Sequence, residues 1–201
     1  MEFGVDVMCS QDPPTVDGLR DRLQSLGDLW PTQAVFGRAW SEHKHGRLLS
    51  LAREAESKGH NWRPEKPVKI GCAVLGYSQG DFDLESVGWN NTPRPLTDAE
   101  KRRFKPCAEK AGIIHCLSRM LMPVGLVIST QHNQPDDDTG LLLDVFTCCS
   151  NCAQWMEVLL PPWFMIGSFC VRPDGSQKYD EWNLSQLVLL HQEALLLRAF
   201  R

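Results

Sequence analysis

Three cysteines and one glutamate are the residues of this chain best suited to chemistry. Glu109 follows Cys107 by two positions, and further along Cys149 and Cys152 form a Cys-x-x-Cys pair. Three thiolates can hold a zinc ion and leave its fourth position open to water, which is the layout of a catalytic site. A carboxylate so close to one ligand can move protons at that water without binding the metal. The spacing therefore predicts an open zinc site with Glu109 as its acid–base residue.

Two other interpretations of the cysteines compete with the open site. In a closed structural zinc site, Cys148 or Cys116 would be the fourth ligand. Side chains of adjacent residues diverge, which argues against Cys148 beside Cys149, and Cys116 would lie about 13 Å from Cys107 along one helix. The second alternative is a redox Cys-x-x-Cys pair, which leaves Cys107 and Glu109 without a role. The open site is therefore the favoured interpretation.

Short apolar segments must position these residues. Apolar residues recur at helical spacing from Cys107 up to residue 121, which predicts a helix there. We expect the Cys107 thiol in the first turn of this helix, where the helix dipole favours a thiolate. The expected order downstream is a strand at 124–130, a strand at 141–146, a helix at 152–160, a strand at 163–171, a turn at 172–178 and a helix at 184–200. Upstream, segments 68–75 and 82–89 are expected to form a hairpin.

This order predicts an α/β protein, a three-layer α/β/α sandwich with a mixed sheet, over residues 66–201. Residues 1–65 are interpreted as an N-terminal helical extension packed on that domain. Its expected helices are 16–30 and a second one that Pro31 opens and that ends near Gly59.

The segment Cys107-Ala108-Glu109, together with Cys149-x-x-Cys152, resembles the cytidine deaminase-like superfamily of zinc-dependent nucleobase deaminases, in its Cys-Ala-Glu variant. The resemblance covers most of residues 66–201. One departure is Cys148, which stands where the family usually has proline. The resemblance implies a Zn²⁺-dependent hydrolase that converts a cytosine-type base to uracil and releases ammonia. A free nucleoside or nucleotide is the expected substrate.

The resemblance also implies substrate contacts. Gly88-Trp89-Asn90 is similar to a family segment whose asparagine binds the nucleoside sugar, so Asn90 is the expected contact and Asn91 the fallback. The alternative is a plain turn. Ala108 and Trp89 are further expected contacts. Trp89, like Phe104 and Trp163, is equally consistent with packing against the base and with a place in the core.

Charge and composition leave the substrate class open. Lys101, Arg102 and Arg103 precede Cys107 and either contact a phosphate or form a solvated face, and Asp136–Asp138 are interpreted as a solvated loop. A net charge of −4 argues against a surface devoted to nucleic acid, yet a polynucleotide cytosine deaminase is the first alternative. A non-catalytic zinc domain for protein interaction is the second.

The remaining expectations concern location and partners. The 201-residue chain shows no apolar run that could span a bilayer and no signal-peptide pattern at its start, so we expect a cytoplasmic protein without membrane partners. Its eight cysteines are then expected to be reduced thiols. A homo-oligomer is expected only by analogy with nucleoside deaminases.

Overall fold

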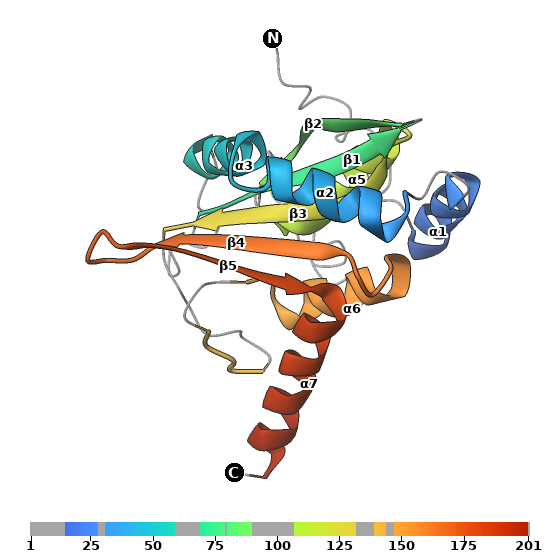
Figure 1. Cartoon of the computed structure of the whole chain (residues 1–201). Coiled ribbons are helices and arrows are strands. Elements are labelled where there is room, and N and C mark those ends of the chain that lie inside the picture. The colour runs from blue at the N-terminus through green and yellow to red at the C-terminus, as the bar shows by residue number, and fades with distance from the viewer. Residues whose placement is uncertain are drawn as a thin grey trace.

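A computed structural model describes residues 15–27, 31–58, 69–78, 80–89, 107–131, 139–143 and 147–200, with all side chains of these ranges except those of 83–87 and 89. Its strands are β1 (Ile70–Ser78), β2 (Asp81–Trp89), β3 (Met122–Thr130), β4 (Met165–Val171) and β5 (Gln177–Asn183). Its helices are α1 (Val16–Ser25), α2 (Gln33–His43), α3 (Arg47–Lys58), α5 (Ala108–Ser118), α6 (Ser150–Leu159) and α7 (Leu184–Ala199) (Figure 1).

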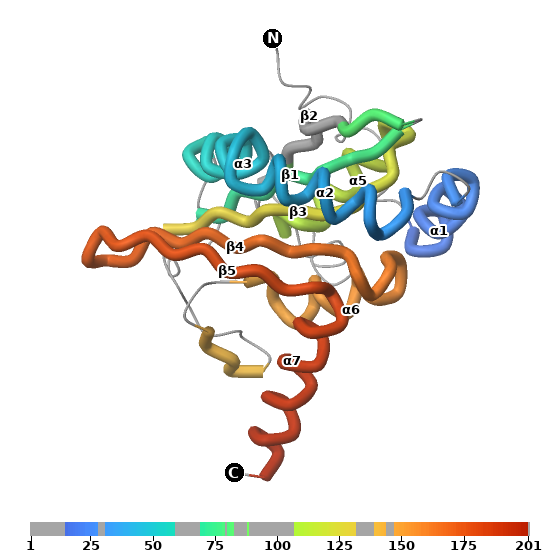
Figure 2. The backbone as a smooth tube through the Cα atoms, in the orientation of Figure 1, coloured from blue at the N-terminus to red at the C-terminus, as the bar shows by residue number. Residues whose placement is uncertain are grey.

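The five strands form one mixed sheet in the order β2-β1-β3-β4-β5. Strands β3 and β4 run parallel, and the other neighbours are antiparallel. Helices α2 and α3 lie in front of the sheet and α5 lies behind it (Figures 1 and 2). This arrangement confirms the predicted three-layer α/β/α sandwich with a mixed sheet, including the hairpin of β1 and β2.

Successive residues of β1 show how closely the two helical layers approach the sheet. A Cβ atom on Gly71 would lie 2.0 Å from the carbonyl oxygen of Ala52 on α3. The next residue, Cys72, faces the other way, and its Sγ would be 3.5 Å from a Cβ atom on Gly112 of α5. Because side chains alternate along a strand, α3 and α5 cover opposite faces. We call these the α3 face and the α5 face.

One hydrophobic core joins the early helices to the sheet. Leu19, Trp40 and Leu48 belong to the same buried cluster as Val74 and Ile128. The early helices are therefore packed on the sheet. The boundary at residue 65 stays a prediction, because residues 59–68 lie outside the described ranges.

The single helix expected between Pro31 and Gly59 is wrong, because a turn at 44–46 divides it into α2 and α3. Contacts with the edge strand β5 hold this turn. Lys44 pairs with Glu181, and the His45 ring lies 4.4 Å from that of Tyr179. After this turn, α3 packs against β1. The break is a long-range effect that helical spacing alone does not reveal.

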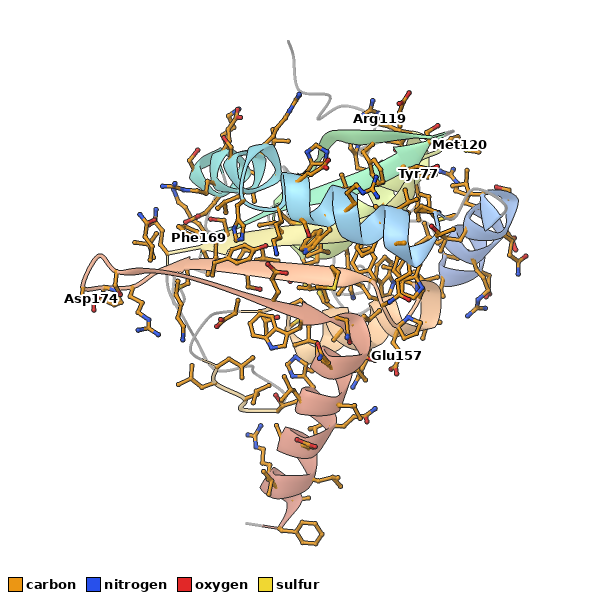
Figure 3. All side chains as sticks on the ribbon, viewed as in Figure 1. Tyr77, Arg119, Met120, Glu157, Phe169 and Asp174 are labelled. Carbon is orange, nitrogen blue, oxygen red and sulfur yellow. The ribbon has the colours of Figure 1, made fainter. Side chains whose placement is uncertain are left out.

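Strand β5 was missing from the sequence prediction, and the strand expected at 141–146 is not seen in its described residues 141–143. Charged residues hide the alternation in β5, as is common for an edge strand. The turn before it carries the signal of a hairpin. Gly175 has φ of 81° and its amide donates to the carbonyl of Arg172, with Asp174 at the tip (Figure 3).

Candidate metal centre

The three candidate ligands lie at the starts of α5 and α6. Cys107 is the N-cap of α5 and Cys149 is the N-cap of α6, both with extended backbones, while Cys152 lies in the first turn of α6. Cys107 is thus just before the turn in which it was expected. Neither N-cap thiol bonds a helix amide, whereas Thr15 caps α1 with its side chain. The positive ends of two helix dipoles therefore meet at a cluster of thiols.

The sulfur atoms converge as the spacing predicted. The Sγ atoms of Cys107, Cys149 and Cys152 all lie within 4.8 Å of one another. Two thiolates of a tetrahedral zinc site stand about 3.8 Å apart, given zinc–sulfur bonds of roughly 2.3 Å. The cluster is within a small adjustment of that spacing. Three thiol donors with no fourth described ligand suit a soft divalent ion such as zinc.

Two of the thiols, those of Cys107 and Cys152, resist loss of their protons while no cation is bound. A hydrogen bond with Cys149, then burial and the neighbouring Glu109, raise the pKa of Cys107 well above its usual value. Hydrogen bonds with the other two thiols, then burial, do the same for the pKa of Cys152. A metal must displace these protons, so its affinity would depend on pH.

Glu109 lies in the first turn of α5, directly behind Cys107. Its side chain is 2% exposed and does not belong to the sulfur cluster. Burial, and next the Cys149 thiolate, raise the pKa of Glu109 to about 7. A carboxyl with a pKa near neutrality can both accept and donate a proton under physiological conditions.

A buried lysine joins the two ligand-bearing helices. The Nζ atom of Lys110 on α5 donates to Oδ1 of Asn151 on α6 at 2.7 Å. The same ammonium lies 5.6 Å from the centre of the Trp155 ring. Since Lys110 follows Glu109 and Asn151 precedes Cys152, this bond ties α5 to α6 beside the cluster. It also places a positive charge close to thiolates and a carboxylate.

The two cysteines considered as a fourth ligand do not join the cluster within the described residues. Cys148 is fully buried, and Cys116 lies further along α5, where its Sγ contacts the carbonyl of Leu121 at 3.6 Å. This placement favours the three-thiol site over the closed alternative.

The predicted substrate contacts are only partly described. Strand β2 ends beside the cluster, because a Cβ atom on Gly88 would lie 2.5 Å from the carbonyl oxygen of the buried Ala108. The side chain of Trp89 and the residues Asn90, Asn91, Lys101, Arg102, Arg103, Phe104 and Asp136–Asp138 lie outside the description. Trp163 packs against Phe36 of α2 at 5.1 Å, which is a core contact.

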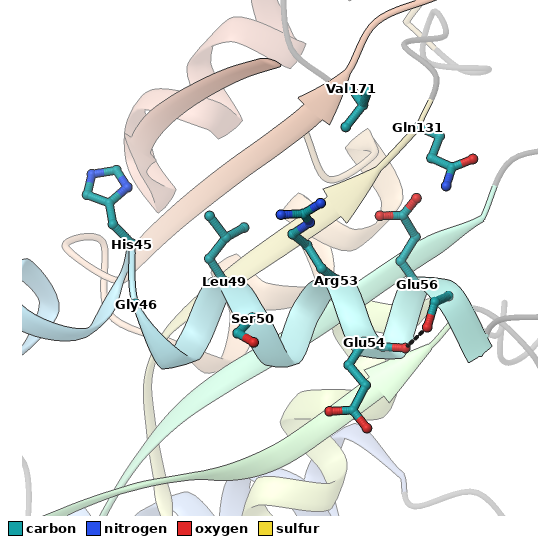
Figure 4. A pocket seen from close by; sticks show the side chains of 10 residues that line it. His45, Gly46, Leu49, Ser50, Arg53, Glu54, Glu56, Gln131 and Val171 are labelled. Carbon is teal, nitrogen blue, oxygen red and sulfur yellow. Dashed lines mark hydrogen bonds between the residues drawn. The ribbon is translucent and has the colours of Figure 1, made fainter. Parts of the chain in front are cut away.

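A separate cavity of about 470 Å³ lies along α3 (Figure 4). Arg53 and Glu56 line it, together with Gln131 after β3 and Val171 at the end of β4. Arg53 also lies 5.2 Å from the centre of the Phe169 ring. None of the candidate ligands lines this cavity, so it is distinct from the sulfur cluster.

Sequence reasoning missed two groups that surround the cluster. One is the pair of Lys110 and Asn151. The other is His191 of α7, whose ring contacts the Cys148 carbonyl and Thr139. The adjacency of Lys110 to Glu109 was a usable signal for the first pair. His191 offered only its position within an apolar helix, which is unusual for a polar residue.

Two comparisons with known proteins bear on the identity of the chain. No family model matches the chain, and no curated protein matches it. Within the described residues, none of the helices combines the length and apolar character that crossing a bilayer demands. The findings on this chain are therefore an α/β/α fold and a three-cysteine cluster that could bind a metal ion.

Proposed function

We propose that the chain is a zinc-dependent hydrolytic deaminase that converts a cytosine-type base to uracil, on a free nucleoside or nucleotide. The observation that carries the proposal is the buried Glu109 beside three converging thiols. A purely structural zinc site has no need of a buried acid with a pKa near neutrality. The resemblance of Cys107-Ala108-Glu109 to the deaminase superfamily supports the same reading.

In this proposal, the thiols of Cys107, Cys149 and Cys152 would hold a zinc ion, which would supply an activated water. Glu109 takes a proton from that water and delivers it to the ring nitrogen of the base. The water oxygen then forms a bond to the amine-bearing ring carbon. Glu109 next takes the proton of the new hydroxyl group and passes it to the amine, whose carbon–nitrogen bond breaks, so that ammonia leaves as the uracil carbonyl forms. The exchange consumes one water per base.

Ammonia release from a substrate panel tests the proposal. The panel contains cytidine, deoxycytidine, their monophosphates, single-stranded oligonucleotides, adenosine and guanosine, each with zinc-loaded and with chelator-stripped protein. We expect zinc-dependent release from a free cytosine nucleoside or nucleotide. Zinc-loaded, folded protein that deaminates nothing in the panel contradicts the proposal and favours a non-catalytic zinc domain.

A triple change of Lys101, Arg102 and Arg103 to alanine separates the substrate classes. For a nucleoside enzyme the change should leave turnover almost intact, and for a nucleotide enzyme it should chiefly raise KM. A polynucleotide enzyme should show a steep loss of affinity with salt, which the triple change flattens by about 0.7 units per lost phosphate contact on single strands. Fast oligonucleotide deamination with that salt slope would contradict the preference for small substrates.

A further inference from the structure

His191 of α7 is a buried histidine with both ring nitrogens in polar contacts. Its side chain is 2% exposed. Nε2 lies 3.0 Å from the carbonyl oxygen of Cys148, and Nδ1 lies 3.4 Å from Oγ1 of Thr139. Helix α7 begins beside α6 and is in contact with it (Figure 1). One side chain thus connects the C-terminal helix with the residue that precedes the ligand Cys149.

The carbonyl partner of His191 fixes the role of one ring nitrogen. A carbonyl oxygen only accepts, so Nε2 carries a proton and donates it to Cys148. On the other side of the ring, Nδ1 lies against the hydroxyl of Thr139, whose oxygen also accepts from the backbone amide of Leu141 at 3.2 Å. The polar contacts thus run from Leu141 through Thr139 and His191 to the Cys148 carbonyl.

The Cys148 carbonyl matters because of where it lies. It belongs to the peptide that joins Cys148 to the N-cap Cys149, and that peptide sets the direction of the Cys149 side chain at the start of α6. The next carbonyl, that of Cys149, accepts the first helical bond from Ala153 at 2.9 Å. The carbonyl before the cap is outside the helical pattern, so another group must satisfy it. His191 does so from behind the ligand loop.

We propose that His191 and Thr139 are positioning residues of the metal centre, which hold the Cys148–Cys149 peptide so that the Cys149 thiol faces the metal. This inference rests on the metal site of the proposed function but not on its deaminase chemistry. Loss of a group that orients a metal ligand typically lowers metal affinity about 10–100-fold. A purely structural histidine would instead affect only the stability of the fold.

Zinc affinity and the spectrum of the cobalt-substituted protein test the proposal without any substrate. His191→Phe retains an aromatic ring but loses the polar contacts with Cys148 and Thr139. Thr139→Val removes only the hydroxyl group. We expect His191→Phe to weaken zinc binding about 10–100-fold in chelator competition and to shift the cobalt bands. Thr139→Val should have a smaller effect in the same direction. His191→Gln, which can still donate to Cys148, should recover part of the affinity.

The matched control is Val188→Ala, which removes buried volume from the same helix without touching the Cys148 carbonyl. It should lower stability and leave zinc affinity and the cobalt spectrum unchanged. Wild-type affinity and cobalt bands in His191→Phe would overturn the proposal. If that variant does not fold, Thr139→Val decides together with the ¹⁵N signals of His191, where an Nε2 atom without a proton overturns it. A weakened metal site in a protein that deaminates nothing would support this inference and reject the proposed function.

Discussion

Each face of the sheet buries a glutamate, and the surroundings of the two differ. Glu56 on the α3 face accepts a hydrogen bond from the Ser129 hydroxyl at 2.6 Å and is 5% exposed. Glu109 on the α5 face is equally buried, and its burial, together with the neighbouring Cys149, raises its pKa to about 7. The same residue type at the same depth thus joins a helix to a strand on one face and lies beside a cluster of thiols on the other. The difference between the two glutamates is therefore in their neighbours and not in their burial.

The largest expected effect comes from removing a ligand on the α5 face. Cys149→Ser should abolish stoichiometric zinc binding and with it any deamination, because two thiols cannot hold the ion as three do. Metal analysis of the purified protein measures this. The control is Cys148→Ala, which should keep one zinc per chain. If Cys148→Ala loses zinc and Cys149→Ser retains it, the ligand assignment is wrong.

The second effect compares the two glutamates directly. Glu109→Gln should retain zinc and lower kcat about 10²–10⁴-fold, because the amide cannot carry protons between water and base. Glu56→Gln is the matched control and should leave kcat unchanged. Steady-state ammonia release and zinc content measure both. Equal losses in the two variants would remove the distinction between the faces, and zinc loss in Glu109→Gln would make Glu109 a ligand.

Lys110 provides a smaller effect on the α5 face. Lys110→Met should lower the free energy of unfolding by about 2 kcal/mol, since it removes a buried hydrogen bond from a charged donor to Asn151. Urea unfolding of the zinc-loaded protein measures the change. Lys58→Met, at the exposed pair with Glu54, should cost less than about 0.5 kcal/mol. An unchanged midpoint in Lys110→Met would show that the bond contributes nothing to holding α5 and α6 together.

The smallest expected effect is the stability change of Glu56→Gln. The amide oxygen can still accept from Ser129, so only the extra strength of a charged acceptor is lost, about 1 kcal/mol. Urea unfolding again measures it, now alongside Glu109→Gln. A loss well beyond that value would mean that the Glu56 carboxylate has a role on the α3 face beyond its bond to Ser129.

The parts of the site that could be predicted are those encoded within a few residues. Cys107 and Glu109 lie at the start of one helix, and Cys149 and Cys152 lie at the start of another. Their spacing along the chain was therefore enough to predict a cluster of three thiols. The contact between Lys110 and Asn151 depends on how those two helices meet. The approach of His191 to Cys148 depends on the docking of α7. Neither follows from local spacing, because both pairs are distant in sequence.

The elements of the fold also differ in whether their local sequence predicts them. Apolar runs such as β3, buried along its whole length, indicate their strand directly. Strand β5 depends on its antiparallel pairing with β4, and the turn at 44–46 contacts β5 through Lys44 with Glu181 and His45 with Tyr179. Their sequences are polar and give no periodic signal. Segments whose structure depends on a distant partner were the ones that sequence reasoning missed.

The order of the ligands along the chain has a consequence for unfolding. Cys107 precedes β3 and Cys149 follows it, and β3 is the middle strand of the sheet. A metal bound to both thiols would cross-link the chain into a closed loop, and β3 is part of that loop. The amides of β3 should then exchange with deuterated solvent only after the metal dissociates and the sheet unfolds. Each tenfold rise in free zinc above its dissociation constant would slow that exchange about tenfold, which corresponds to roughly 1.4 kcal/mol.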